Sequence, residues 1–420
     1  MNEAQQASKP VQRAWALYDW ANSVYSLVIT TAIFPIFYNA ITADTVTFFG
    51  SEFSNTQLYA YILASSFLVV IVLNPLLSGL ADYAGKKKFF MKVFCYTGAV
   101  ACTTMYWFNP EQLEWSMASL FLANIGFWGS LGFYNAYLPE IAPREEQDRL
   151  GARGYIMGYI GSLILLVVCL VMIQVWEVSA RWAFVLVGVW WVSWAQPAFL
   201  KLPVNPFKHA GGGRLLAKGF EELRGVARDL ADQKGLKRYL LSFFIISMAL
   251  QTIMLMASSF GIKEVKLNDT ELIIAIIAVQ ILAIPGARIV AWMSGRYGNV
   301  RTLMLCTLIW AGVCVYAYAG VRTTNGFFVA AGIIGFMMGG TQSLNRSTYS
   351  KMLPDTEDHA SYFSFYEVLE QGGLIIGMFS WGYIEGFTGS MRTSVLALIL
   401  FFAAALAVMS TIPKGTVRTS

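Results

Sequence analysis

The chain has 420 residues, of which 56% are hydrophobic and only 13% are charged. A soluble domain carries about 25% charged residues, so this composition excludes a water-soluble protein and indicates a multi-pass membrane protein. The net charge of +5 does not point to nucleic-acid binding, because the basic residues stand in short clusters between apolar runs. Residues 1–13 are polar and lead into no signal-peptide cleavage pattern, so we expect the first apolar run to remain as an anchor.

Apolar runs of about twenty residues cross a bilayer as helices. The sequence contains twelve such runs, near residues 16–39, 57–80, 88–108, 115–138, 152–175, 181–200, 239–260, 271–293, 301–320, 325–348, 361–384 and 392–411. We therefore expect an all-α membrane protein with twelve transmembrane helices.

The first span carries polar residues at helical spacing, namely Asp19, Asn22, Ser23, Ser26 and Thr30. Residues three, four and seven positions apart share one face of a helix. A polar stripe inside a membrane must face protein or water. The pattern therefore predicts a polar cavity beside the first span.

The distribution of lysine and arginine indicates how the spans are oriented. Most of the 30 lie on one side: at the N-terminus, in the loops after the second, fourth, eighth and tenth spans, in the central connection, and in the C-terminal tail. Cytoplasmic loops carry this excess. We expect both termini in the cytoplasm and the protein in the cell (inner) membrane.

The longest connection joins the sixth and seventh spans through residues 201–238. It contains a flexible break at residues 211–213 and then apolar residues at helical spacing among charges: Phe220, Leu223, Ala227 and Leu230. This pattern predicts an amphipathic helix on the membrane surface, which acts as a linker or binds a protein partner.

The two halves of the chain repeat one plan. The second and eighth spans each contain a proline, Pro75 and Pro285, followed by a glycine turn at Gly85 and Gly298. The third and ninth spans each carry two cysteines. We expect six-helix halves at residues 1–200 and 239–420, joined by a linker at 201–238. Repeats of this kind place a solute site near the membrane midplane between the halves.

The segment Ser-Gly-Leu-Ala-Asp82-Tyr-Ala-Gly85-Lys86-Lys87 resembles the signature loop of the major facilitator superfamily. Ser78 replaces the leading glycine of the family pattern, and Tyr83 replaces an arginine. The resemblance implies a cytoplasmic latch, in which Asp82 faces a helix N-terminus and a basic residue of the loop. Gly295 stands where the second half would repeat this aspartate.

A narrower resemblance concerns three clusters of residues, Trp15-Ala-Leu-Tyr-Asp-Trp-Ala-Asn-Ser, Tyr-Leu-Pro139-Glu-Ile-Ala-Pro-Arg and Gly-Tyr-Ile-Met-Gly-Tyr-Ile-Gly161. They are similar to the branch that includes the fungal autophagy-related vacuolar amino-acid effluxer. The fungal members of this branch imply export of amino acids. Many bacterial members have no assigned solute, so the resemblance leaves the solute open.

Polar residues on the spans that line the cavity in this superfamily are the expected solute ligands. The candidates for substrate binding are Asn22, Tyr25, Asn124, Trp128, Asn135, Gln251, Arg288 and Asn345. Each asparagine or glutamine can instead bond a neighbouring helix. A lone arginine in a span is costly, so Arg288 either forms a buried ion pair or binds a solute carboxylate.

A second set of residues is expected to serve proton coupling or gating: Asp19, Asp82, Lys86, Arg346, Glu367 and Glu370. Asp19 either caps or gates the start of the first helix or binds solute or a proton. Glu367 and Glu370 share one face of the eleventh span. Two neighbouring carboxylates in an apolar site can retain a proton, although pairing with Arg346, Lys351 or Arg288 is the simpler alternative.

The expected function is secondary transport of a small polar solute, an amino acid by resemblance, as a symporter or effluxer. The alternatives are a permease for sugars or cell-wall fragments and a non-transporting membrane protein such as a scramblase or sensor. No nucleotide-binding motif, metal-ligand spacing or catalytic pair is visible, so we expect no enzyme activity and no cofactor. The expected partners of this monomer are its solute, the lipid bilayer and protons.

Overall fold

A computed structural model describes residues 8–204, 215–413 and 417. The predicted break at residues 211–213 lies outside this part of the chain. The described residues form two compact units. Unit 1 comprises the chain up to Tyr137 together with Met157–Leu223 and Asp358–Ser364, and unit 2 comprises Leu138–Ile156, Arg224–Glu357 and the chain from Phe365 onward.

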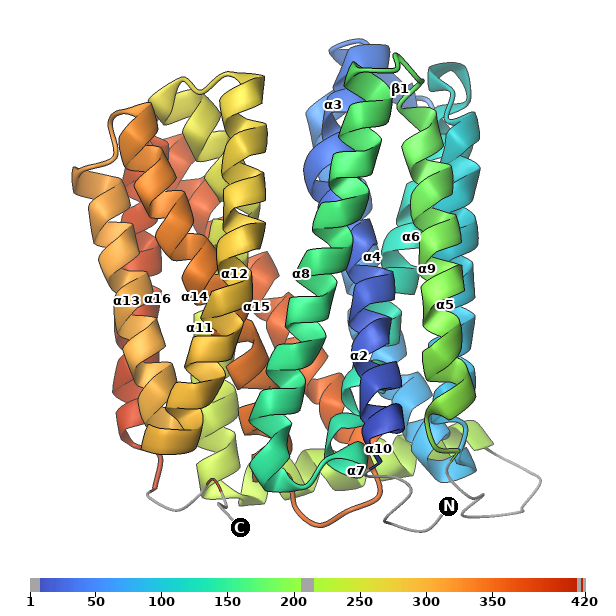
Figure 1. Cartoon of the computed structure of the whole chain (residues 1–420), viewed down its shortest axis with the longest axis vertical. Coiled ribbons are helices and arrows are strands. Elements are labelled where there is room, and N and C mark those ends of the chain that lie inside the picture. The colour runs from blue at the N-terminus through green and yellow to red at the C-terminus, as the bar shows by residue number, and fades with distance from the viewer. Residues whose placement is uncertain (1–7, 205–214, 414–416, 418–420) are drawn as a thin grey trace. The chain divides into compact units, whose positions relative to one another are not determined.

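The first half of the chain contains most of unit 1 (Figure 1). Its helices are α2 (Lys9–Val24), the π-helix η1 (Tyr25–Ile33), α3 (Phe34–Ile41), α4 (Asn55–Ala84), α5 (Lys87–Thr104), η2 (Met105–Trp107), η3 (Pro110–Gln112), α6 (Leu113–Asn135), α7 (Leu138–Ile141), α8 (Arg144–Gln174) and α9 (Arg181–Lys201). A short antiparallel hairpin of β1 (Thr45–Phe48) and β2 (Ser51–Ser54) pairs Thr45 with Ser54 between α3 and α4.

The second half contains most of unit 2. Its elements are α10 (Leu215–Asp232), α11 (Lys234–Phe260), the π-helix η4 (Gly261–Val265), α12 (Asp269–Tyr297), α13 (Asn299–Ala319), α14 (Thr324–Met352), α15 (His359–Thr388) and α16 (Met391–Ser410). All twelve predicted spans coincide with long helices of the structure.

Ten helical segments among the described residues are long and apolar enough to cross a membrane. The other two predicted spans, α5 and α15, are not among these ten, and each contains three charged residues. Lys87, Lys88 and Lys92 lie in α5, and Glu367, Glu370 and Glu385 lie in α15. Charges within a span are expected where the helix faces protein or water rather than lipid.

The helix pairs that pack within each half confirm that the chain contains a structural repeat. In unit 1, α5 packs on α6, α2 on α9, α5 on α9 and α4 on α6. In unit 2 the equivalent pairs are α13 on α14, α11 on α16, α13 on α16 and α12 on α14. Every one of these contacts in the first half therefore has a counterpart in the second.

Glycine allows the closest of these contacts, between α12 and α14. A side chain at Gly286 would overlap the carbonyl oxygen of Phe336, and one at Gly340 would overlap Val290. Small residues let helix backbones approach closely in a membrane protein, where dispersion contacts supply much of the association energy. The glycines that follow Pro285 and that line the tenth span thus fix the spacing of two helices.

The first span departs from the predicted α-helix at Tyr25, where η1 begins. The hydroxyls of Thr30 and Thr31 both donate to the carbonyl oxygen of Ser26, at 2.6 and 2.9 Å. A π-helix has a wider turn than an α-helix, so the three-and-four spacing no longer defines a face beyond this point. The predicted stripe from Asp19 to Thr30 is therefore not one straight line.

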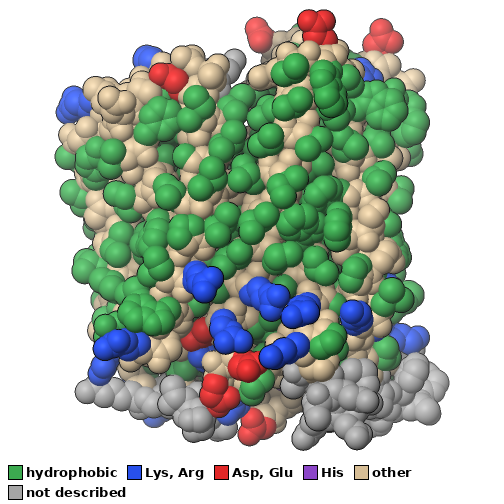
Figure 2. All heavy atoms as spheres, in the orientation of Figure 1, with side chains coloured by type: hydrophobic (Ala, Val, Ile, Leu, Met, Phe, Trp, Pro, Cys, Tyr) green, Lys and Arg blue, Asp and Glu red, His purple; other side chains and the backbone are tan. Residues whose placement is uncertain are grey.

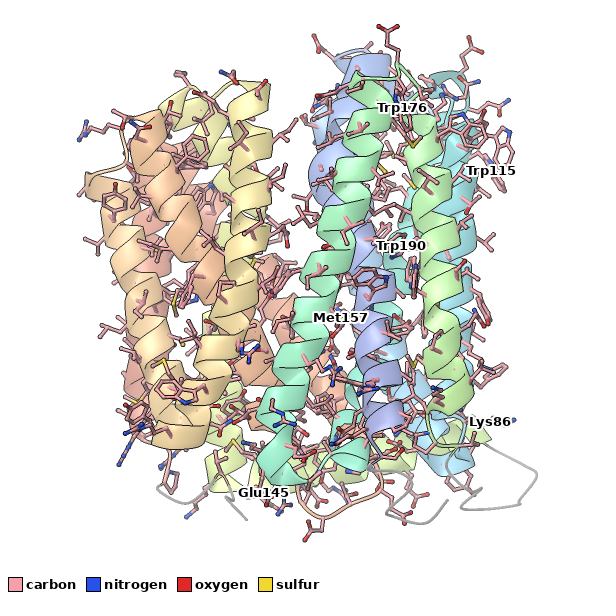
Figure 3. All side chains as sticks on the ribbon, viewed as in Figure 1. Lys86, Trp115, Glu145, Met157, Trp176 and Trp190 are labelled. Carbon is pink, nitrogen blue, oxygen red and sulfur yellow. The ribbon has the colours of Figure 1, made fainter. Side chains whose placement is uncertain are left out.

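The surface of the helices is suited to a bilayer. Hydrophobic side chains cover the middle of the visible face, and Lys and Arg side chains gather toward its lower part (Figure 2). In unit 1, the exposed Trp115 and Trp176 lie near the end of the helices opposite to Lys86 (Figure 3). Tryptophan favours the interface between membrane and water, so this arrangement fits a multi-pass protein.

The predicted amphipathic helix after the sixth span corresponds to α10, and its apolar side chains differ in burial. Val226 and Leu230 are buried, whereas Phe220 and Ala227 are exposed. Exposed apolar side chains such as Phe220 are compatible with a helix that lies on a membrane surface, and that placement stays a prediction.

Candidate functional site

The tenth span of the chain, α14 in unit 2, contains a buried arginine. Arg346 of α14 is only 2% exposed. Its Nη2 donates to the carbonyl oxygen of Gly151 at 2.9 Å, and its Cζ lies 4.3 Å from the centre of the Tyr155 ring. Both partners belong to the first turns of α8. A guanidinium held between a carbonyl and an aromatic face keeps its charge and has a fixed orientation.

A carboxylate in the eleventh span faces the same region. The Nε2 of Gln251 on α11 donates to the Oε1 of Glu370 on α15 at 2.6 Å. Glu370 is partly buried, and its charge interacts with that of Arg346. Glu367, one turn earlier on α15, is almost fully buried. The structure thus brings Gln251, Arg346 and Glu370 together from three spans.

Four buried aromatic rings lie beside this charged region. Phe243 stacks on Tyr366 at 4.1 Å between ring centres, Tyr366 on Tyr349 at 5.2 Å, and Tyr239 lies 6.4 Å from both Phe243 and Tyr349. We call these four residues the aromatic quartet. Tyr239 also donates its hydroxyl to the carbonyl oxygen of Asn345 at 2.7 Å. The quartet joins α11, α14 and α15 into one packed layer.

The sequence does not reveal the quartet, because aromatic residues are abundant throughout the spans (15% of the chain). Asn345, a predicted solute ligand, is buried, and the contact that fixes its position uses the backbone oxygen. The side-chain Oδ1 of Asn345 has no hydrogen-bond partner among the described residues, and its role as a solute ligand stays a prediction.

Asp82 at the end of the second span contacts the start of the eleventh. Its Oδ2 accepts a hydrogen bond from the backbone N–H of Ser361 at 2.7 Å, and its Oδ1 accepts one from that of Ala360 at 3.3 Å. The first N–H groups of a helix have no partner inside the helix, and a negative charge there is stabilised by the helix dipole. This is the arrangement that the signature loop implies.

The basic residue beside Asp82 differs from the one that the loop suggests. Lys86 is exposed, whereas Lys87 is 2% exposed, and its Nζ lies 4.2 Å from the centre of the Tyr137 ring. Gly85 turns the chain in a left-handed conformation (φ +64°), which brings the second lysine inward. The structure therefore favours Lys87 over Lys86 as the buried cation of this loop.

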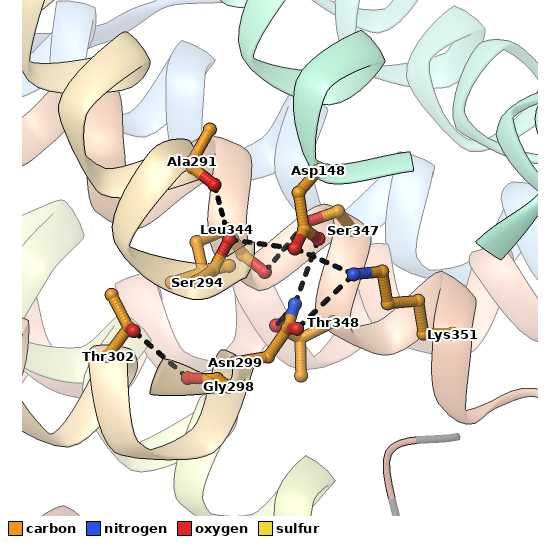
Figure 4. Close-up of polar contacts among 10 residues, drawn as sticks. All are labelled: Asp148, Ala291, Ser294, Gly298, Asn299, Thr302, Leu344, Ser347, Thr348 and Lys351. Carbon is orange, nitrogen blue, oxygen red and sulfur yellow. Dashed lines mark hydrogen bonds and ion pairs between the residues drawn. The ribbon is translucent and has the colours of Figure 1, made fainter. Parts of the chain in front are cut away.

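A second polar cluster surrounds Asp148 of α8 (Figure 4). Its Oδ2 lies 2.6 Å from the Nζ of Lys351 and accepts the hydroxyl of Ser294 at 2.7 Å, and its Oδ1 accepts the Nδ2 of Asn299 at 2.9 Å. Asn299 also donates to the hydroxyl of Thr348 at 3.0 Å. Every member is buried. Buried charges need such pairing, since desolvation of each ion is costly.

Asp148 does not stand out in the sequence. This residue stands among the charged residues Arg144, Glu145, Glu146 and Arg149, where a loop or a solvated helix start is the usual interpretation. The only signal available was Lys351, a lysine close to the end of an apolar span that needs a counter-charge.

Asp19 takes part in helix packing within unit 1. Its Oδ2 accepts the hydroxyl of Tyr134 at 2.8 Å, and the backbone oxygen of Tyr134 accepts the indole N–H of Trp15 at 3.0 Å. Because α2 begins at Lys9, Asp19 lies in the third turn of the helix and does not cap it. The capping role considered from the sequence is therefore wrong.

The other candidates of unit 1 are mostly in contact with neighbouring helices. Asn124 donates to the hydroxyl of Ser66 on α4 at 2.5 Å. Tyr25 is buried between Phe127 and Trp191, and so belongs to the core of unit 1. These contacts give Asn124 and Tyr25 a packing role in this state of the protein.

Three predicted solute ligands of unit 1 remain to be placed. Trp128 packs edge-to-face on Phe67 of α4 at 5.5 Å. Asn22 and Asn135 are buried, and the oxygen of Asn22 lies 3.5 Å from the hydroxyl of Ser23. The Nδ2 of Asn22 has no hydrogen-bond partner among the described residues, and solute contact by the two asparagines stays a prediction.

Arg288 lies on the exposed surface of α12. It forms no ion pair with any residue in the described part of the chain, so the buried ion pair considered from the sequence is not present there. Within the same described residues, no group of three or more His, Cys, Asp or Glu side chains lies close enough to hold a metal ion.

Comparison with known proteins agrees with the fold. A family model described as "Vacuole effluxer Atg22 like" matches residues 7–418. The uncharacterized MFS-type transporter YxiO of Bacillus subtilis is 30% identical over an alignment that covers 96% of this chain and 95% of the relative. Autophagy-related protein 22 of Yarrowia lipolytica is 21% identical, with 84% and 75% covered.

Solved structures show the same architecture. The major facilitator superfamily transporter FucP in its outward conformation has a TM-score of 0.72 at 14% identity, covering 98% of this chain and 100% of that chain. The human organic anion transporter MFSD10 has a TM-score of 0.72 at 12% identity, with 97% and 100% covered. With the family match over almost the whole length, these likenesses show that the chain belongs to the vacuole effluxer Atg22 like family of major facilitator superfamily transporters.

Proposed function

We propose that this secondary transporter moves a small polar solute, an amino acid, by alternating access of its two six-helix halves. The observation that carries the proposal is the charged site of unit 2, where Arg346, Glu370 and Gln251 meet inside helices that cross the membrane. Charged side chains at such depth are costly and mark solute or ion pathways. A positive and a negative side chain close together are suited to a solute that carries one negative and one positive group, as an amino acid does.

The contacts of Asp82 and Asp148 support the alternating-access part of the proposal. Asp82 lies on the second span and contacts the eleventh, while Asp148 lies on the fifth span and contacts the eighth, ninth and tenth. Each contact thus joins a helix of the first half of the chain to a helix of the second half. Breaking and remaking such contacts is the proposed gating step of a transporter whose halves rock against one another.

The proposal places the protein in the cell membrane with both termini in the cytoplasm, following the excess of lysine and arginine on one side. Protons are the proposed coupling ion, through Glu367 or Glu370. The description of the matched family, "Vacuole effluxer Atg22 like", supports transport by efflux, whereas the amino-acid solute follows from the resemblance described under the sequence.

A thermal-shift screen of the purified protein against amino acids, sugars and short peptides tests the solute class. A bound amino acid should raise Tm, because a ligand that binds only the folded state stabilises it. The proposal is withdrawn if sugars or peptides alone raise Tm. FucP, which shares the fold, is a fucose:proton symporter, so fucose is a necessary member of the sugar panel.

Flux into proteoliposomes, with and without a pH gradient, tests the coupling ion. Glu367→Gln and Glu370→Gln should each abolish the effect of the gradient if that residue carries the proton. Unchanged gradient dependence in both variants would remove the two glutamates as proton carriers and leave the solute assignment standing. Lack of any solute flux in the wild type would instead favour a scramblase or sensor.

A further inference from the structure

Glu370 has only one of its two carboxylate oxygens bonded. Gln251 donates to Oε1 at 2.6 Å, whereas Oε2 accepts no hydrogen bond and Glu370 forms no ion pair with any residue that the structure describes. The side chain is only partly buried, so Oε2 is not sealed inside the protein. A carboxylate oxygen in such a place is open to a further donor, since an ionised carboxylate accepts hydrogen bonds through both of its oxygens.

The helices around Glu370 hold it in place. One turn before it on α15, Tyr366 stacks on Phe243 of α11 at 4.1 Å. One turn after it, Gly373 lets α15 approach α11 so closely that a side chain there would meet Ser247 at 2.8 Å. Glu370 and Gln251 therefore face one another across a tight seam, and the carboxylate cannot move far to find another donor.

The neighbouring amide adds an unsatisfied polar group. Gln371 is 1% exposed, and neither its Nε2 nor its Oε1 has a hydrogen-bond partner among the described residues. Buried amides are nearly always bonded. Two successive residues of α15 thus carry unmet hydrogen-bonding capacity at the level where Gln251 meets the helix.

We infer that Glu370, oriented by Gln251, binds the ammonium group of the transported solute. An ammonium supplies three N–H donors and a positive charge, which match the open oxygen of a carboxylate. Charge-assisted hydrogen bonds of this type are roughly twice as strong as those between neutral groups. This inference rests on the proposed transport function and adds the residue that recognises the amine of the solute.

Two alternatives fit Glu370 less well. A permanent ion pair with Arg346 would leave no role for the open oxygen, and the guanidinium is already held by Gly151 and Tyr155 of α8. A purely structural acid would have both oxygens bonded, as Asp82 and Asp148 do. Glu370 differs from those two carboxylates in this respect.

Matched solutes test the inference by thermal shift and by competition in flux. The probes are leucine, phenylalanine and glutamate, each beside its deaminated partner (4-methylpentanoate, 3-phenylpropanoate and glutarate), together with 3-methylbutylamine and 2-phenylethylamine. For any amino acid that stabilises the wild type, we expect its affinity to exceed that of the deaminated partner by roughly tenfold or more, and this preference should vanish in Glu370→Gln.

The control is Glu385→Gln, which makes the same change on the same helix at a residue bonded to Lys263. It should retain the preference for the amine. Gln251→Met, which removes the orienting donor but keeps the length of the side chain, should reduce the preference without abolishing it. Glu370→Asp replaces Glu370→Gln if the latter is not monodisperse and folded, and its shorter carboxylate should weaken amine binding while retaining some preference.

The outcomes separate this inference from the proposed function. A folded Glu370→Gln variant that prefers the amino acid over its deaminated partner as strongly as wild type overturns the inference but leaves amino-acid transport intact. If the free amines bind in a Glu370-dependent manner and no amino acid does, the ammonium site stands and the amino-acid proposal falls. If neither amines nor amino acids bind the wild type, both are wrong.

Discussion

Asp82 and Asp148 each bind a helix of the first half of the chain to a helix of the second half, but the two acids come from different spans of the repeat. In unit 1, Asp82 lies on the second span itself and accepts two backbone N–H groups at the start of the eleventh span. In unit 2, Gly295 stands at the position equivalent to Asp82, and the carboxylate comes instead from Asp148 of the fifth span. The fifth and eleventh spans are equivalent in the repeat. The contact between the second and eleventh spans thus has its acid on the second span, whereas the equivalent contact between the eighth and fifth spans has its acid on the fifth.

This exchange explains why the second copy of the signature loop looks degenerate in the sequence. Its turn is retained, because Gly298 has a positive φ (+86°) just as Gly85 has (+64°). The donors to the acid differ: in place of two backbone N–H groups they are the side chains of Ser294 and Asn299, on either side of that turn. A contact between two helices can persist in a duplicated fold even when its charged residue has changed helix.

Removing Asp148 should have the largest effect. Asp148→Asn leaves Lys351 buried without its counter-charge, and breaking a buried pair in this way costs about 3–5 kcal/mol. We expect a clear fall in Tm and in the free energy of unfolding, measured by heat and by denaturant in detergent. The double variant with Lys351→Met should recover much of the loss, and a double variant no better than Asp148→Asn would contradict the assigned pair.

Removing Asp82 should cost less than removing Asp148. Asp82→Asn keeps the shape of the side chain but loses two charge-assisted bonds at a helix N-terminus, worth about 1.5–3 kcal/mol. The neighbouring cation provides a further comparison, since Lys87→Met should lower Tm and Lys86→Met should not. Equal effects of the two lysine variants would show that burial of Lys87 plays no part in this loop.

Placing an aspartate at Gly295, the position of the eighth span that is equivalent to Asp82, tests whether the acid can come from either helix of the contact. A side chain at Gly295 meets nothing within 4 Å, so Gly295→Asp is sterically allowed. Introduced into Asp148→Asn, it should recover about 1 kcal/mol by placing a carboxylate near the start of α8. Gly295→Ala in the same background is the matched control, and it should recover nothing.

The smallest effect is expected at the exposed ion pair of the same region. Arg144 lies 2.8 Å from Asp355, whose side chain is 83% exposed. Exposed pairs contribute little, because water screens both charges. Asp355→Asn should leave Tm unchanged within error. A fall in Tm comparable to that of Asp148→Asn would mean that burial does not explain the difference between these two acids.

The sequence predicts the spans far better than it predicts the site. Every apolar run became a helix because length and hydropathy alone determine insertion into a bilayer. The partners of polar residues depend on which helices are neighbours, and this is why Asp148 was overlooked and why Lys86 was chosen where Lys87 is the buried residue.

Local geometry accounts for the remaining differences between prediction and structure. The π-helix at Tyr25 shifts the polar face of the first span, and the longer start of α2 places Asp19 beyond any capping position. By contrast, Gln251, Arg346 and Glu370 were all selected as candidates from their chemistry, since a charged or amide side chain within an apolar run is conspicuous. What the sequence lacked was the pairing of Gln251 with Glu370.

The close approach at Gly286 has a mechanical consequence. Because the backbone of α12 at Gly286 touches that of α14 at Phe336 with no room for a methyl group, the two helices cannot slide past one another without a steric clash. The two helices should therefore move as one rigid body during a conformational cycle. Arg346 lies ten residues beyond Phe336 on α14 and moves with that body. A substitution at Gly286 should therefore shift Arg346 and weaken solute binding without touching the solute.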